Sequence, residues 1–211
     1  MNEIQLYLPG VLLSLSAVML AIMSPGPNIL AVIGTSMGVG REQGIALALG
    51  VGSGTFLWVL LAVLGFTAVI SKYAFVMIAL KILGGLYLLW LGYKALRSAA
   101  SVKDVNTSAI MLKSKTAYFK RGLTVQMTNP KAALATLAIV SIGVHADAPV
   151  WVGSSIVIGA TLLSVGGHIL YALAFSTKSM VAVYVRARRY IEGALGAFFV
   201  FIGLRLLTDR S

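Results

Sequence analysis

The sequence predicts an all-α integral membrane protein whose six transmembrane helices form two inverted three-helix repeats, each with a proline-broken first helix. Hydrophobic residues make up 59% of the 211 residues, charged residues make up 11%, and the mean hydropathy is +0.94. Several apolar runs must therefore lie in lipid. These runs follow one another along the whole chain, and prolines interrupt the first and the fourth.

The first span is the run from 6 to 39, which has no charged residue and exceeds the ~20 residues that one helix needs to cross a bilayer. Two prolines without N–H groups and a glycine interrupt it, so a straight helix cannot continue. Carbonyls freed inside a membrane need partners, and such breaks occur where protein or a polar cavity surrounds them. We therefore take this break as a candidate substrate site: Ser24, Pro25, Gly26, Pro27 and Asn28.

Five further spans are predicted, with Lys81 inside the third and a break at Asn129-Pro130-Lys131 early in the fourth. The long basic segment 94–121 is predicted to be a loop, and 176–189 a polar connection. The first, third and fifth connections hold twelve lysines and arginines, whereas the second and fourth hold Lys72 alone. This bias places the basic connections in the cytoplasm and both termini outside, although Arg205 and Arg210 oppose it. The five spans are 45–70, 73–91, 123–144, 150–175 and 190–207.

An internal repeat supports the inverted arrangement. Residues 85–94 align with 196–205 without a gap, and in this register Lys81 falls opposite Glu192. Because each half has three spans, the halves enter the membrane from opposite faces, and breaks at matching places indicate a transporter site at the midplane. The alternative is a symmetric bundle with kinks. We expect one transmembrane domain, 1–211, with repeat 1 at about 1–97, a basic cytoplasmic loop at about 94–121 and repeat 2 at about 120–211.

At three motifs the chain resembles the lysine exporter (LysE) superfamily and, within it, the homoserine/threonine exporter (RhtB) family. The motifs are 24–28, 84–94 and 128–132, and the similarity covers essentially the whole chain. The resemblance implies a six-span inner-membrane exporter of amino acids, with the proton gradient as the expected driving force. Many relatives carry acidic residues where Asn28 and Thr55 stand here, so a coupling role for those acids cannot be carried over.

A zwitterionic substrate needs one partner for its carboxylate and one for its ammonium group. Helix N-termini attract carboxylates and freed carbonyls attract cations, so both breaks are candidate substrate sites, and Asn28 and Asn129 are expected to cap the helices that begin there. The alternative is that these two asparagines cap their helices and have no role in binding. Lys81 is a candidate partner for the substrate carboxylate. The alternatives are that its side chain snorkels toward the membrane interface or pairs with Glu192. Lys131 is unfavourably placed near a helix N-terminus, which suggests a nearby anion. The second group of candidates is Lys81, Asn129, Pro130 and Lys131.

Proton coupling requires a titratable group within the spans, and the candidates are His168 and Glu192. The alternative for His168, which follows two glycines, is a hydrogen-bonded helix contact. For the function of the chain, the rival hypotheses are a metal-ion exporter on a related fold, an intramembrane enzyme and a non-transporting scaffold. The spans lack the clustered ligands of a metal site and the catalytic sets of an enzyme, so we expect no catalytic residue, metal or cofactor.

The expected partners are an amino acid, protons and the lipid bilayer. The net charge of +11 indicates topology rather than nucleic-acid binding, because the basic residues lie in short connections. We expect a multi-pass protein of the bacterial inner membrane, with homo-oligomerisation left open. The sequence does not determine the amino acid exported, or whether the first segment is a broken span or a re-entrant hairpin.

Overall fold

The computed structural model describes residues 3–24, 26–70, 74–101, 110–145, 147–176 and 178–208. Within these ranges it describes side chains except at 66–70, 74–81, 178–181 and 184–185. All regular structure in the described part of the chain is helical. The helices are α1 (Glu3–Met23), α2 (Pro27–Gly38), α3 (Arg41–Ile70), α4 (Ala74–Ala99), α5 (Lys115–Met127), α6 (Pro130–Gly143), α7 (Val150–Ala174) and α8 (Lys178–Thr208).

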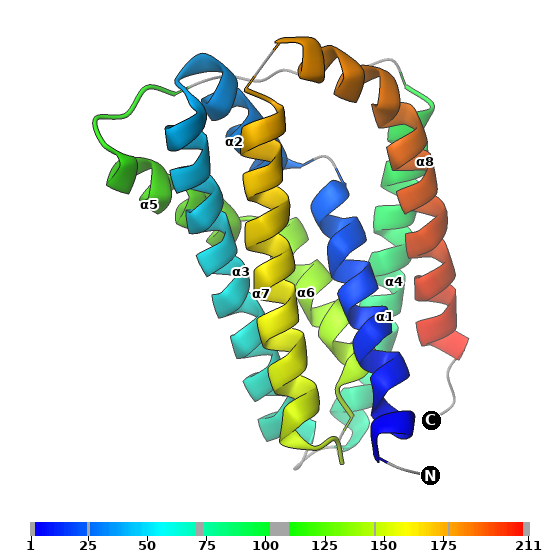
Figure 1. Ribbon diagram of the computed structural model, residues 1–211. Helices are drawn as coiled ribbons and strands as arrows, with labels where there is room; N and C mark the ends of the chain where they lie inside the picture. Colours follow the sequence, from blue (N-terminus) through cyan, green and yellow to red (C-terminus); the bar gives the residue numbers. More distant parts are fainter. Residues whose placement is uncertain are drawn as a thin grey trace.

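Two helix pairs, α1–α2 and α5–α6, stand where the sequence predicts broken spans. Helix α1 begins at the end of the bundle where both termini lie, and α2 leads to the opposite end, where α3 begins (Figure 1). The first segment therefore runs from end to end instead of turning back. The end of α2 and the start of α3, the end of α4, and the end of α7 lie opposite the termini (Figure 1). Basic residues stand at some of these helix ends, such as Arg41 at the start of α3 and Arg97 in the last turn of α4.

Four helical segments are long and apolar enough to cross a membrane, and α6 is a shorter apolar helix. Large apolar side chains on their outer faces, such as Leu61, Leu162 and Leu170, are more than half exposed. Lipid is the solvent that makes such faces stable, because helices satisfy their own backbone hydrogen bonds there. The chain is a multi-pass membrane protein. The four segments are Glu3–Met23, Arg41–Gly65, Val150–Ala174 and Arg186–Thr208.

Helix α3 lies between α5 and α7, and α4 packs along α8. The α3–α5 contact depends on two glycines that let the backbones approach closely. A Cβ atom at Gly50 would lie 2.0 Å from the carbonyl oxygen of Phe119, and one at Gly122 would lie 2.0 Å from that of Leu47. Since both obstacles are backbone atoms, a side chain here must move a helix.

Gly122→Ala is expected to lower the stability of the protein by about 1–3 kcal/mol, the usual cost of overpacking a tight core. Thermal unfolding in detergent measures the effect. Gly166→Ala is the matched control, because a Cβ atom at Gly166 meets nothing within 4 Å. Equal midpoints for the two variants would contradict the close α3–α5 contact.

The loops predicted at 94–121 and 176–189 are wrong in part. Helix α4 continues to Ala99, α5 begins at Lys115, and α8 begins at Lys178. Ser114 stabilises the start of α5, because its side-chain oxygen accepts a hydrogen bond from the N–H of Ala117 at 3.2 Å. Hydropathy detects contact with lipid rather than helix formation, so it does not distinguish charged helical ends from loops.

Candidate functional site

The two helix breaks face each other, and hydrogen bonds between side chains connect them. The Nδ2 of Asn28 donates to Oε1 of Gln126, and the Nδ2 of Asn129 donates to Oδ1 of Asn28 at 3.3 Å. These bonds join the start of α2 to the end of α5 and the start of α6. Side chains on both sides of the second break therefore belong to one network with the start of α2.

The two asparagines differ in their capping role. Asn129 caps α6, because its Oδ1 accepts a hydrogen bond from the N–H of Lys131 at 3.1 Å. The cap predicted at Asn28 is wrong, since the N-cap of α2 is Gly26, which offers no side chain. Helix α2 begins at Pro27, before the predicted cap, because proline lacks the N–H and its fixed φ suits the first helical position. Asn28 is thereby left to bond across the break.

A cavity of about 90 Å³ lies between the breaks. By the same measure one water needs roughly 10–15 Å³, so the cavity holds several waters or a small solute. Its lining includes apolar side chains, such as Val18, Ile22, Val59, Ile139 and Ile156. It also includes hydrogen-bonding groups from five helices, with Asn28, Thr55, Gln126, Asn129, Lys131, Ser164 and His168 among them.

The polar wall continues beyond the breaks as a chain of hydrogen bonds. The Nε2 of Gln126 donates to Thr55 Oγ1 at 2.9 Å, and this oxygen lies 2.8 Å from Ser164 Oγ. The Nδ1 of His168 donates to the carbonyl oxygen of Ser164 at 2.8 Å. Trp58 Nε1 donates to the backbone oxygen of Gln126 at 3.2 Å, which fixes this end of α5. Hydrogen bonds among the lining residues thus fix the positions of their side chains.

Sequence reasoning did not select Gln126, Thr55 or Ser164 as site residues. All three are buried, with exposed fractions of 4%, 8% and 1%. Each is an uncharged polar residue inside a helix, where transmembrane bundles also use such residues for packing. The available signal was the position of Gln126, which lies shortly before the second break.

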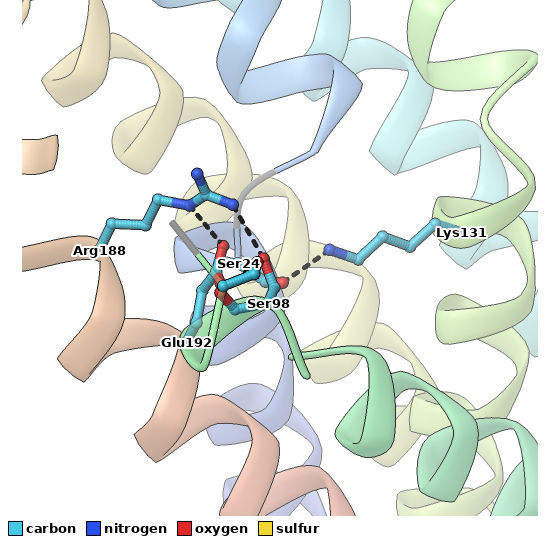
Figure 2. Close-up of polar contacts among 6 residues, drawn as sticks. Ser24, Ser98, Lys131, Arg188 and Glu192 are labelled. Atoms are coloured by element: carbon cyan, nitrogen blue, oxygen red, sulfur yellow. Dashed lines mark hydrogen bonds and ion pairs between the residues drawn. The ribbon is translucent and has the colours of Figure 1, made fainter. Parts of the chain in front are cut away.

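Lys131 is the one lysine or arginine among the described residues that line the cavity. It lies in the first turn of α6, and its Nζ donates at 2.7 Å to Oγ of Ser24, the residue that follows α1 (Figure 2). Ser24 and Lys131 therefore link the two breaks a second time. The anion predicted near Lys131 stays a prediction.

Glu192 on α8 is 3% exposed and lies in a cluster with Arg188 and Ser98 (Figure 2). The Nε of Arg188 donates to Oε1 of Glu192 at 2.8 Å, and its Nη2 donates to Ser98 Oγ at 2.8 Å. The cluster ties α8 to the end of α4. The side chain of Lys81 lies outside the described residues, so its predicted pairing with Glu192 stays a prediction.

The remaining predicted site residues are the prolines and the glycine of the two breaks. Pro25 lies outside the described residues. Pro27 and Pro130 begin α2 and α6 at positions that need no N–H donor. Gly26 lines the cavity, and a Cβ atom there would lie 3.6 Å from the Nζ of Lys131, an ordinary contact.

Comparison with known proteins matches nearly the whole chain to one transporter family. The LysE type translocator family matches residues 19–210. A threonine efflux protein of Salmonella typhimurium is 31% identical over 192 residues, covering 90% of this chain and 93% of the relative. The threonine efflux protein of Escherichia coli is 30% identical over 195 residues, with coverage of 90% and 93%. A leucine efflux protein of Klebsiella pneumoniae is 31% identical over 196 residues, with coverage of 90% and 91%. No solved structure matches the chain.

Proposed function

Because the chain belongs to the LysE type translocator family, we propose that it is a secondary transporter of the bacterial inner membrane that exports small neutral amino acids such as threonine and homoserine. Relatives named for threonine and leucine efflux support this class of substrate. The observation that carries the proposal is the meeting of two broken helices at one cavity, whose lining combines amides, hydroxyls and one cation with apolar side chains. Such a wall suits a solute with both polar and apolar parts.

The order of the helices supports a proposal for the transport cycle. We propose six spans, with α1–α2 and α5–α6 as broken first spans and the pairs α3/α7 and α4/α8 as their successors in two inverted repeats. The domain 1–211 would then open alternately to each side by rocking of one repeat against the other. The contacts across the breaks, between Asn28, Gln126 and Asn129, are the ones that such rocking must rearrange.

The orientation is proposed from the basic connections. The helix ends that flank these connections lie at one end of the bundle, and a cytoplasmic position for that end would follow the positive-inside bias. The substrate would then enter past α2 and the start of α8 and leave toward the end that holds the termini.

Proton coupling remains a proposal with two candidate carriers. His168 lines the cavity and donates to the carbonyl of Ser164, which makes its ring part of the site as well as a helix contact. Glu192 is a buried carboxylate toward the proposed cytoplasmic side. A carrier must be reachable from each side in turn, and a substitution of either residue that left protonophore sensitivity intact would exclude it.

The function is tested by efflux from whole cells. Cells that produce the protein are expected to lose preloaded threonine or homoserine faster than control cells, and a protonophore is expected to remove the difference. Unchanged efflux across a broad panel of amino acids would contradict export. Efflux that persists with the protonophore would contradict the coupling alone.

The asparagines of the two breaks allow a matched comparison. Asn28→Ala is expected to reduce efflux and to lower the unfolding midpoint only through the bonds that Gln126 and Asn129 lose, because Asn28 does not cap its helix. Asn129→Ala is expected to reduce efflux and also to destabilise the protein by about 1 kcal/mol, the usual value of a lost N-cap. Normal efflux from folded Asn28→Ala protein would show that its contacts across the break are structural.

A further inference from the structure

Two cavities adjoin each other at α1, and one side chain lines both. The transport cavity, which is the one between the breaks, has a volume of about 90 Å³, and an apolar groove between α1 and α7 has about 450 Å³. Helices α1 and α7 pack against each other (Figure 1). In the described part of the chain, Ile22 is the one residue that lines both spaces. Other residues that line the groove include Met19, Met23, Leu163, Gly167 and Leu170.

The side chain of Ile22 packs directly on the backbone of α7. A Cβ atom at Gly167 would lie 2.9 Å from Cγ2 of Ile22, well inside ordinary van der Waals contact. Ile22 therefore has its place because residue 167 lacks a side chain. The neighbouring Gly166 also lines the groove, but a Cβ atom there meets nothing within 4 Å. Ile22 thus lies between the two spaces, held against Gly167.

The two spaces suit side chains of different size and polarity. At roughly 10–15 Å³ for each water, the transport cavity holds about six to nine waters, a space that an amino acid of the size of threonine fills. The groove is several times larger, and its lining residues Leu162 and Leu170 are 66% and 67% exposed on the face where we place the lipid. Lipid tails are as apolar as leucine, so an apolar side chain replaces a tail there at little cost. A polar side chain would lose hydrogen bonds in the same place.

We propose that Ile22 sets the upper size limit of the exported side chain, because it separates the transport cavity from a groove that would otherwise receive larger apolar side chains. This inference rests on the proposed export of amino acids. Isoleucine suits such a role, since its branched Cβ leaves one strongly preferred rotamer in a helix. Met19 and Met23 have unbranched side chains that adapt to their surroundings. Ile22 is therefore the stiff part of the boundary on α1.

The alternative is that Ile22 serves packing alone. It is partly buried and packs against the largest cluster of buried apolar side chains. Lost packing lowers the amount of folded protein, and this changes the efflux of all substrates by the same factor. A changed size limit instead alters the ratio between a large and a small substrate. The ratio of phenylalanine efflux to threonine efflux is therefore the decisive readout.

The experiment compares initial rates of efflux from cells preloaded with threonine, phenylalanine or glutamine. Ile22→Ala is expected to raise the ratio of phenylalanine to threonine efflux by about tenfold or more, since one methylene in an apolar pocket changes discrimination by about 10–200-fold. Glutamine, whose side chain is longer than that of threonine but ends in an amide, is expected to gain no comparable advantage. Met19 lines the groove and not the transport cavity, so Met19→Ala is the matched control and is expected to keep the wild-type ratio.

The two glycines of α7 test the same boundary in the opposite direction. Gly167→Ala is expected to push Ile22 toward the transport cavity, because the new methyl group takes the space that Ile22 occupies. Threonine efflux should then fall by about tenfold relative to alanine efflux. Gly166→Ala makes the same change at the next position and is expected to keep the wild-type ratio.

An unchanged ratio of phenylalanine to threonine efflux in folded Ile22→Ala protein would overturn the inference. An equal rise in Met19→Ala, or an equal gain for glutamine, would overturn it as well. If Ile22→Ala does not fold or exports nothing, the two glycines decide, because equal ratios of threonine to alanine efflux in Gly166→Ala and Gly167→Ala overturn the assignment. Absence of efflux of every amino acid tried, in cells that contain folded wild type, would instead refute the proposed function.

Discussion

Lys131→Gln is expected to reduce threonine efflux by about tenfold or more while leaving the protein folded. The change removes the one lysine or arginine among the described cavity-lining residues. A hydrogen bond to a charged group contributes about 1.5–3 kcal/mol, and about 1.4 kcal/mol corresponds to a factor of ten. Glutamine keeps a donor near Ser24, so the loss reports the charge rather than the hydrogen bond.

Initial rates of efflux from preloaded cells, corrected for protein in the membrane, measure the effect. Lys131→Arg is expected to retain more activity than Lys131→Gln because it keeps the charge. Lys120→Gln is the matched control, since Lys120 is exposed on α5 and does not line the cavity. Equal losses in Lys120→Gln and Lys131→Gln would show that the effect comes from net charge and not from the site.

The second large effect is expected at Gln126. Gln126→Leu should lower threonine efflux by about tenfold or more relative to leucine efflux, because a wall built to bond a hydroxyl discriminates strongly against its absence. The introduced leucine side chain also replaces the amide with an apolar surface. The variant should be less stable by about 1–3 kcal/mol, since the partners Asn28 and Thr55 lose their bonds.

Competition between threonine and leucine in one efflux assay measures this preference. Thr124→Val makes a comparable polar-to-apolar change on the exposed side of the same helix and is expected to leave the ratio unchanged. A ratio that stays constant in folded Gln126→Leu protein would place the recognition of the substrate side chain elsewhere.

The sequence predicted the helix breaks because proline acts locally. A missing N–H and a ring clash end a helix wherever they occur, so Pro27 and Pro130 marked the two breaks, which lie at the starts of α2 and α6. Lys131 was selected for a similar reason, since a cation at a helix N-terminus is unfavourable without a partner. These inferences need no knowledge of distant residues.

The partners of these residues could not be predicted in the same way. Gln126 contacts Asn28 and Thr55, which are 98 and 71 positions away in the chain. Only the packing of α5 against α2 and α3 brings them together. An uncharged polar residue in a helix has no local signature of such a contact, and therefore the polar wall emerged from the fold. The cap expected at Asn28 failed for a different reason, because the neighbouring proline moved the helix start to Pro27.

The hydrogen bonds between side-chain amides of the two breaks bear on the step in which an exporter returns without substrate. Asn28, Gln126 and Asn129 satisfy one another directly. A carrier whose site is self-satisfied does not need water or an ion to occupy it during the return, because each of these amides already has a partner. We therefore expect the empty carrier to return with little uncoupled leak of ions. This property would depend on the neutral side chains of the two breaks rather than on a gate.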